Sequence, residues 1–356
     1  MNRVLTGTVL GVMSGTSLDG MDLAVCNFTY ENNKWSFQMM VAETIPYSTD
    51  WLNTLQQLHQ AGGAELCRVD MEYGKLIGEQ CKSFINKHQL KVDFIASHGH
   101  TIFHQPHLGF TKQIGHGAAI AAASGLPIVN DFRSLDVALG GQGAPLVPIG
   151  DALLFAQYDA CLNLGGFANI SFMQQHKRIA FDICPCNVLL NHLSNRIGME
   201  YDKGGLISAS GKMNVALFDD LNALPFYQKT GAKSLGIEWV HAQIFPLFNQ
   251  YSYLSVQDLL ATVSHHVAHQ ISRVLAQVNT HQVLVTGGGA YHSYLIELIN
   301  EYSKLNMVIP DSELIAFKEA IIFALLGFLR WHGMENCLKD VTGSFRNNSG
   351  GSIWRS

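Results

Sequence analysis

The chain has 356 residues, enough for about two domains, and its 14% of charged residues is too low for a disordered or coiled-coil protein. The formal net charge of −5, without a long basic run, argues against nucleic acid and anionic membranes as partners. No apolar stretch is long enough to span a bilayer, and the start lacks the features of a signal peptide. With seven dispersed cysteines, these features predict a cytoplasmic protein with reduced thiols.

The first part of the chain predicts three strands followed by alternating helices and strands. Short turns join only antiparallel neighbours, so the three apolar segments form a meander, at 4–14, 21–28 and 35–45. Helical spacing and short apolar runs then predict a helix at 49–60, a helix at 68–88, a strand at 92–97, a helix at 118–124 and a strand at 127–130.

The same pattern then begins again. The strands of the second meander are expected at 160–163, 168–173 and 177–182, and helices follow from 187–196 to 256–278. A strand at 282–286, a helix at 291–302 and a final helix at 312–331 end the expected regular structure. This repeat predicts a duplicated α/β unit: a first domain of residues 1–130, joined by 335–356, and a second of 131–334.

Glycine-rich turns occur at matching places in both halves. Glycine lets backbone N–H groups approach an anion without a Cβ in the way. In the first turn, Thr16 and Ser17 add hydroxyl donors, and Asp19 is placed to hold Mg²⁺ through water. An ordinary Asp-Gly hairpin turn at Asp19–Gly20 is the alternative interpretation.

Two further turns extend this pattern. Gly165–Gly166 lies in the first hairpin of the second half, and Gly287–Gly289 follows a strand and precedes a helix, which suits a nucleotide's α-phosphate or adenosine. Together the three turns predict two domains flanking a nucleotide cleft, as in actin-like ATPases. The ATP-binding residues expected from these turns are Gly15, Thr16, Ser17, Leu18, Asp19, Gly20, Met21, Asp22, Asn163, Gly165, Gly166, Asn169, Gly287, Gly288 and Gly289.

The opening segment Gly11–Asp22, read GVMSGTSLDGMD, resembles the signature of anhydro-N-acetylmuramic acid kinases. Matches to that family continue along nearly the whole chain, at Ser97–Gly99, Asp131–Arg133, Gly140–Pro148, Asn163–Gly166, Phe181–Asp182 and Thr286–Gly289. The resemblance implies a duplicated actin-like ATPase (ribonuclease H-like) fold and a homodimer. It also implies an ATP- and Mg²⁺-dependent kinase of peptidoglycan recycling, which opens 1,6-anhydro-N-acetylmuramic acid with water and phosphorylates O6.

That reaction needs a base, because water attacking C1 must lose a proton. Asp182, at the end of the second meander, fits this role. The alternative is that Asp182 caps the helix starting near Asn187.

Sugar recognition needs polar side chains. Arg133 is expected to bind the lactyl carboxylate through two N–H groups, or alternatively to form an ion pair with Asp131 or Asp136. The expected contacts to hydroxyl or acetamido groups are His98, Thr101, Asp131 and Gln142.

The chain departs from the family pattern beside the proposed base, where Ile183, Cys184 and Cys186 replace a threonine and two glycines. These changes put the catalytic rate in question more than the fold. Two other functions stay open: a kinase of the same fold acting on an ordinary hexose, and a nucleotide-gated binding protein without catalysis.

Overall fold

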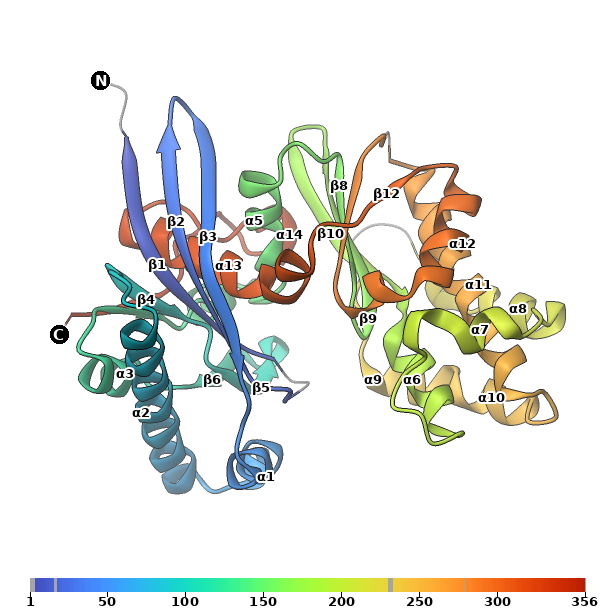
Figure 1. The fold of residues 1–356 in the computed structure, drawn as a ribbon, viewed down its shortest axis with the longest axis horizontal. Coiled ribbons are helices and arrows are strands. Elements are labelled where there is room, and N and C mark those ends of the chain that lie inside the picture. Colours follow the sequence, from blue (N-terminus) through green and yellow to red (C-terminus); the bar gives the residue numbers. More distant parts are fainter. Residues whose placement is uncertain (1–3, 16–17, 230–232, 279, 356) are drawn as a thin grey trace. The chain divides into compact units, whose positions relative to one another are not determined.

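A computed structural model describes residues 4–15, 18–229, 233–278 and 280–355 (Figure 1). The chain forms two compact units, Met1–Leu154 with Phe317–Ser356, and Phe155–Ala316. Among the helices of the described residues, none combines the length and the apolar character needed to cross a membrane.

The first unit is built on a six-stranded sheet. Three strands form the predicted antiparallel meander, and two later strands lie parallel to the first. A short strand near the end of the chain completes the sheet by pairing antiparallel with β7. The order is β13-β7-β4-β1-β2-β3, with β1 Leu5–Ser14, β2 Met21–Glu31, β3 Lys34–Ile45, β4 Phe94–Ser97, β7 Ile128–Asn130 and β13 Ser352–Trp354.

Helices cover both faces of this sheet. On one face, Leu10 and Val12 of β1 form a core with the apolar side chains of α2 and α3. On the other face, α13 lies so close to β1 that a Cβ at Gly11 would overlap the carbonyl oxygen of Ala320. The helices are α1 Thr49–Gln57, α2 Gly63–Lys87, α3 Gly117–Ser124, α4 Ser134–Ala138, α5 Val147–Leu154, α13 Ser312–Trp331 and α14 Lys339–Thr342.

The second unit repeats the strand order and directions of the first. Its five-stranded sheet runs β10-β9-β8-β11-β12, with β8 Ala160–Leu164, β9 Phe167–Gln174, β10 Lys177–Pro185, β11 Val283–Thr286 and β12 Met307–Val308. As in the first unit, a meander is followed by two strands parallel to its first strand. This repeated topology is the predicted duplicated actin-like ATPase fold. Its helices are α6 Asn187–Asn195, α7 Leu206–Ser210, α8 Val215–Asn222, α9 Ile237–Gln243, α10 Phe245–Gln250, α11 Val256–Leu275 and α12 Ser293–Ser303.

The two units divide at different residues from those expected. Residues 131–154 and 317–334 pack with the first unit, whereas the sequence placed them in the second. One reason is the close packing of α5 on α13, where a Cβ at Gly150 would lie 2.6 Å from Ile322 Cγ1. The chain enters the first unit within α13, and the segment that follows this helix also belongs to it, as predicted.

Several elements were not predicted, among them α4, α5 and β12. Residues His100–Gln105 (β5) and Phe110–Ile114 (β6) form a separate antiparallel hairpin. The expectation that regular structure ends at Trp331 is wrong, because α14 and β13 follow it. Strand β13 has only three residues and owes its conformation to pairing with β7, which no local pattern reveals.

Candidate active site

The first glycine turn joins β1 to β2. The N–H of Leu18, which has a φ of +62°, donates to the carbonyl of Gly15 at 3.3 Å. Gly20 has no room for a side chain, since a Cβ would lie 2.7 Å from the carbonyl oxygen of Ile45. Asp19 is exposed at this turn. Of the residues expected here, Thr16 and Ser17 lie outside the described residues.

Asp22 stands two residues into β2, after Met21. Its carboxylate accepts a 2.6 Å hydrogen bond from the Thr44 hydroxyl on β3. Burial raises the pKa of Asp22; the Thr44 hydrogen bond opposes this effect, and the nearby charge of Asp19 adds to it. Oxygen ligands of this kind suit Mg²⁺, which binds through one or two carboxylates, water and phosphate. Among the described residues no group of three or more His, Cys, Asp or Glu side chains is arranged to hold a metal ion.

A largely buried chain of hydroxyl groups supports the end of β1, and no pattern in the sequence indicates it. The Tyr47 hydroxyl donates to Ser14 Oγ at 2.6 Å and lies 2.7 Å from the Tyr73 hydroxyl. Ser14 Oγ also lies 2.8 Å from His100 Nδ1. Burial lowers the pKa of His100 to about 4, so this histidine is neutral at pH 7.

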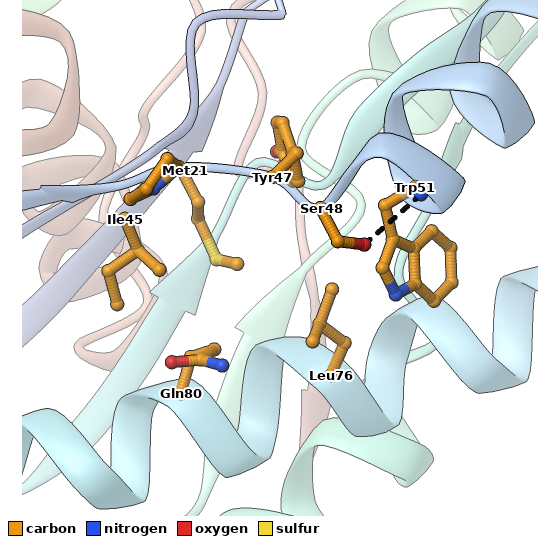
Figure 2. A pocket seen from close by; sticks show the side chains of 8 residues that line it. Met21, Ile45, Tyr47, Ser48, Trp51, Leu76 and Gln80 are labelled. Carbon is orange, nitrogen blue, oxygen red and sulfur yellow. Dashed lines mark hydrogen bonds between the residues drawn. The ribbon is translucent and has the colours of Figure 1, made fainter.

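A small cavity adjoins this chain (Figure 2). It has a volume of about 180 Å³ and lies among the ends of β2 and β3 and the helices α1 and α2. Mostly apolar side chains line it, and Ser48 at its rim accepts a hydrogen bond from the Trp51 N–H at 3.3 Å. None of the predicted sugar-binding residues lines this cavity; its walls are Met21, Ile45, Pro46, Tyr47, Ser48, Trp51, Leu76 and Gln80.

The carboxyl ends of the parallel strands β1, β4 and β7 meet at one edge of the first sheet, where α/β folds usually bind ligands. His98 follows β4 here and is buried. Its Nε2 accepts a 3.0 Å hydrogen bond from Arg133 Nε, and its Nδ1 lies 2.9 Å from the Gly99 carbonyl. Burial and the charge of Arg133 hold the pKa of His98 well below its usual range. Both ring nitrogens therefore have protein partners.

Arg133 is held in two places. Besides the contact to His98, its Nη1 donates to the Gly143 carbonyl at 2.7 Å. Burial lowers the pKa of Arg133 to about 10, so it is still charged at pH 7. Within the described residues it forms no ion pair with Asp131 or Asp136, which removes the alternative interpretation. Among the described residues, Nη2 of Arg133 has no protein partner. Arg133 could therefore bind a carboxylate through two hydrogen bonds, one from Nη2 and one from the second proton of Nη1.

The other predicted sugar-binding residues belong to the same unit. Asp131 has a φ of +59° and accepts a 2.6 Å hydrogen bond from the Ser134 hydroxyl. Thr101 lies half-buried on β5 and accepts from Gln113 Nε2 at 3.3 Å. Gln142 is exposed and is anchored through its N–H to the Thr342 carbonyl at 2.8 Å.

In the second unit, four polar residues form one row across the sheet. Thr286 lies opposite Asn163, Asn163 opposite Asn169, and Asn169 opposite Asp182. Directly opposed residues on paired strands point to the same face. The row therefore brings together Asn163 and Asn169, which were predicted to bind ATP, and Asp182, the predicted base. Thr286 is the fourth member and was not predicted as a site residue.

The Asp182 carboxylate uses one oxygen within the protein. Oδ2 accepts a 2.8 Å hydrogen bond from the Leu235 N–H, and in the described part of the chain Oδ1 has no partner. Burial raises the pKa of Asp182, and the Leu235 hydrogen bond opposes this effect. Asp182 does not cap α6, whose N-cap is Cys186 with no side-chain cap bond. It is therefore a half-buried carboxylate with one oxygen available to a proton donor.

The Gly165–Gly166 turn has its carbonyls engaged by α6. The N–H groups of Asn187 and Val188 donate to Gly165 and Gly166 respectively, each at 3.2 Å, and the Cys186 N–H donates to Gly166 at 2.8 Å. Since N–H and C=O of one peptide point in opposite directions, the Gly166 N–H points away from α6. A Cβ at Gly166 would meet nothing within 4 Å. In the described residues the Gly166 N–H donates to no protein acceptor, so this turn keeps an N–H for an anion.

The third glycine segment packs against the end of β8. Gly287 has a φ of +82°, and a Cβ there would lie 2.5 Å from Asn163 Oδ1. A Cβ at Gly289 would lie 2.6 Å from Leu164 Cβ, whereas Gly288 meets only Asn187 Nδ2 at 3.6 Å. Residues Gly288–Tyr291 form a single 3₁₀ turn before α12. Gly287 and Gly289 are therefore required by packing, and Gly288 is open to a ligand.

The departures beside Asp182 lie in the core. Ile183, Cys184 and Cys186 are all at most 1% exposed and belong to the main apolar cluster of the second unit. Their side chains are directed into packing, and burial holds the pKa of each thiol above its usual range. They fill the core next to Asp182 without adding a reactive group.

The chain matches known proteins over nearly its whole length. The family model described as anhydro-N-acetylmuramic acid kinase matches residues 7–356. The anhydro-N-acetylmuramic acid kinase of Mannheimia succiniciproducens is 34% identical, with 97% of this chain and 98% of the relative covered. That of Pseudomonas putida is 38% identical, with 82% and 83% covered. Among solved structures, component A of (R)-2-hydroxyglutaryl-CoA dehydratase from Acidaminococcus fermentans is 13% identical, with 90% of this chain and 97% of that one covered. Its TM-score of 0.46 is too low to indicate function. The sequence matches show that this chain belongs to the anhydro-N-acetylmuramic acid kinase family.

Proposed function

We propose that this protein uses water to open the 1,6-anhydro bond of anhydro-N-acetylmuramic acid and transfers the γ-phosphate of ATP to O6. The products are N-acetylmuramic acid 6-phosphate, an intermediate of peptidoglycan recycling, and ADP. Family membership supports the kinase activity and the sugar class. The observation that supports the hydrolytic step is the Asp182 carboxylate, whose raised pKa and unpartnered Oδ1 suit a base acting on water.

In the proposed reaction, Asp182 Oδ1 accepts a proton from water as the water oxygen bonds to C1. The C1–O6 bond breaks and its electron pair goes to O6. O6 then attacks the γ-phosphorus, and the bond to the ADP oxygen breaks. Leu235 keeps Oδ2 occupied, which directs the proton to Oδ1.

Two glycine turns are proposed to bind the phosphates. The Gly166 N–H has no protein acceptor among the described residues, and Asn163 and Asn169 lie at the same hairpin. The remaining residues assigned to ATP are those of the first turn and Gly287–Gly289. When bound, Mg²⁺ would neutralise phosphate charge, and the exposed Asp19 would hold it through water.

For the sugar, we assign Arg133 to the lactyl carboxylate through Nη2 and the free proton of Nη1. Thr101, Asp131 and Gln142 are assigned to polar groups of the ring. His98 was expected to contact the sugar, but both its nitrogens have protein partners, so we assign it to orienting Arg133.

A coupled ADP-release assay tests the proposal. Turnover on the anhydro sugar is expected to exceed turnover on N-acetylmuramic acid, which lacks the bond to be opened. Preference for N-acetylmuramic acid would instead indicate an ordinary sugar kinase, and ATP binding without sugar-dependent ADP release would indicate a non-catalytic protein. The homodimer that the resemblance implies stays a prediction, and light scattering would test it.

A further inference from the structure

Asp136, on α4, is a fully buried carboxylate without a cationic partner. It is 0% exposed, and no Lys, Arg or His of the described residues forms an ion pair with it. Its Oδ1 accepts hydrogen bonds from Asn348 Nδ2 at 2.8 Å, Thr342 Oγ1 at 2.9 Å and Cys337 Sγ at 3.1 Å. Its Oδ2 accepts from the Gly143 N–H at 2.8 Å. A buried charge needs such complete satisfaction, because leaving it unpaired is costly.

These donors come from two distant parts of the chain. Cys337, Thr342 and Asn348 belong to the segment after α13, whereas Gly143 ends the turn that follows α4. The contact to this turn is close, since a Cβ at Gly141 would overlap Asp136 Oδ2. The carboxylate therefore fixes the 140–143 turn to the C-terminal segment.

The 140–143 turn also holds two of the proposed sugar-binding residues. Gly143 donates its N–H to Asp136 and accepts Arg133 Nη1 on its carbonyl at 2.7 Å. The Gln142 N–H donates to the Thr342 carbonyl, and the hydroxyl of that threonine donates to Asp136. One intermediate residue therefore links each side of the site to the Asp136 carboxylate: Gly143 links Arg133 to it, and Thr342 links Gln142 to it.

We propose that Asp136 is a positioning residue, which sets the guanidinium of Arg133 and the backbone of Gln142 for sugar binding without touching the sugar. This inference rests on the proposed function for the identity of the sugar. Burial alone would raise the pKa of Asp136, but hydrogen bonds led by those of Cys337 and Gly143 lower it overall, so the group is ionised at pH 7.

The charge is needed, because a neutral amide of the same shape cannot replace it. In an Asp136→Asn variant the NH₂ group must face either Gly143 or the three donors at Oδ1, and in both positions donor meets donor. We expect the KM for the anhydro sugar to rise about tenfold or more, with the KM for ATP changed less than about twofold. The milder Thr342→Val variant removes one donor and should raise the same KM by a smaller factor.

Asp70→Asn serves as the matched control. Asp70 is also buried and accepts a backbone N–H, that of Gly115, at 2.8 Å, and it pairs with Lys112. Its loss should lower the melting temperature without changing the sugar KM. A sugar KM that rises equally in the control would show a general structural effect and overturn the proposal.

A double-mutant cycle with Arg133→Ala tests the path. If Asp136 acts through Arg133, most of the effect of Asp136→Asn on the sugar KM should vanish in the Arg133→Ala background, and fully additive effects would overturn the proposal.

A crystal structure of Asp136→Asn tests the positioning role independently of the proposed sugar-binding function. In that structure we expect Gly143 and Arg133 to be displaced. An unchanged sugar KM in Arg133→Ala would count against the assignment of Arg133 to the sugar, but not against this displacement. An unmoved Gly143–Arg133 contact would overturn the positioning role.

Discussion

Asn169 and Asp182 lie directly opposite each other on the adjacent antiparallel strands β9 and β10. The register shifts immediately after this pair, between Asp182 and Cys184. Such an irregularity re-aims the following side chains and often accompanies functional sites. Here it separates a polar pair from the buried Cys184 and Cys186, so that the same segment of chain supplies both the half-buried Asp182 carboxylate and core packing.

Replacing Asp182 with Asn should abolish most turnover. The variant loses the proton acceptor but keeps the shape, so turnover should fall by about 10²–10⁴-fold while ATP affinity changes little. Asp159→Asn, which alters an exposed carboxylate of the same unit that accepts the His281 N–H at 2.7 Å, is the control. Retention of a tenth of normal turnover by Asp182→Asn would exclude an essential base.

The pH dependence follows from the raised pKa of Asp182. Only the carboxylate accepts a proton, so kcat/KM should fall as pH drops through a value above the ordinary 3.8 of aspartate. For stability the sign is reversed: a carboxyl whose pKa is raised in the folded state destabilises the fold when ionised. Asp182→Asn should therefore be at least as stable as the natural protein at pH 8 in urea, and this advantage should shrink on acidification. A variant clearly less stable at pH 8 would contradict the sign.

Alanine substitutions at two glycines should separate ligand obstruction from backbone strain. Gly166→Ala should fold with normal stability, because the Cβ has space and φ is ordinary, yet bind ATP more weakly. Gly287→Ala should lose about 1–3 kcal/mol of unfolding free energy, since it needs φ near +82° and overlaps Asn163. Calorimetric titration with ATP and urea denaturation measure the two effects. Unchanged ATP affinity in folded Gly166→Ala would argue against the second hairpin as a phosphate site.

Arg133→Lys should raise the KM for the sugar by about tenfold or more, because a lysine keeps the charge but not the planar set of donors. The KM for ATP should stay within about twofold. Arg68→Lys, at an exposed arginine paired with Glu65 and Glu72, is the matched control. Equal sugar KM values for the natural protein and Arg133→Lys would remove Arg133 from the sugar site.

Asp19→Asn should shift the Mg²⁺ dependence of the rate to higher concentration by several-fold, since the exposed turn loses a carboxylate oxygen. The rate at saturating Mg²⁺ should fall less. Asp50→Asn, an exposed change in the first turn of α1, should leave the titration unchanged. An identical Mg²⁺ midpoint in Asp19→Asn would show that this carboxylate does not help to hold the ion.

The sequence was informative where local chemistry determines structure. Both meanders, their glycine turns and the long helix α11 follow from apolar periodicity and turn residues, and the observed repeat confirms the duplicated fold. The polar row of Asn163, Asn169 and Asp182 was predicted only as separate residues. Their alignment depends on strand register, which brings in Thr286 from a strand more than a hundred residues away.

Long-range packing explains what the sequence could not show. The domain boundary depends on α5 packing against α13, and β13 forms because it can pair with β7. His98 looked like a sugar ligand because an exposed imidazole would serve well. In the structure, Arg133, 35 positions away, donates to its Nε2, a contact that no local pattern reveals. The same holds for Asp136, three of whose hydrogen-bond partners lie more than 200 positions along the chain.

In the proposed reaction, water opens the anhydro bond in the same active site that phosphorylates O6. Turnover in oxygen-18 water tests it, with prompt analysis because a free anomeric hydroxyl exchanges with water. We expect label at C1 alone, with the original bridging oxygen kept as O6 and carrying an unlabelled phosphoryl group. Label at O6 or in the transferred phosphoryl group, or no label at C1 during efficient phosphorylation, would contradict it.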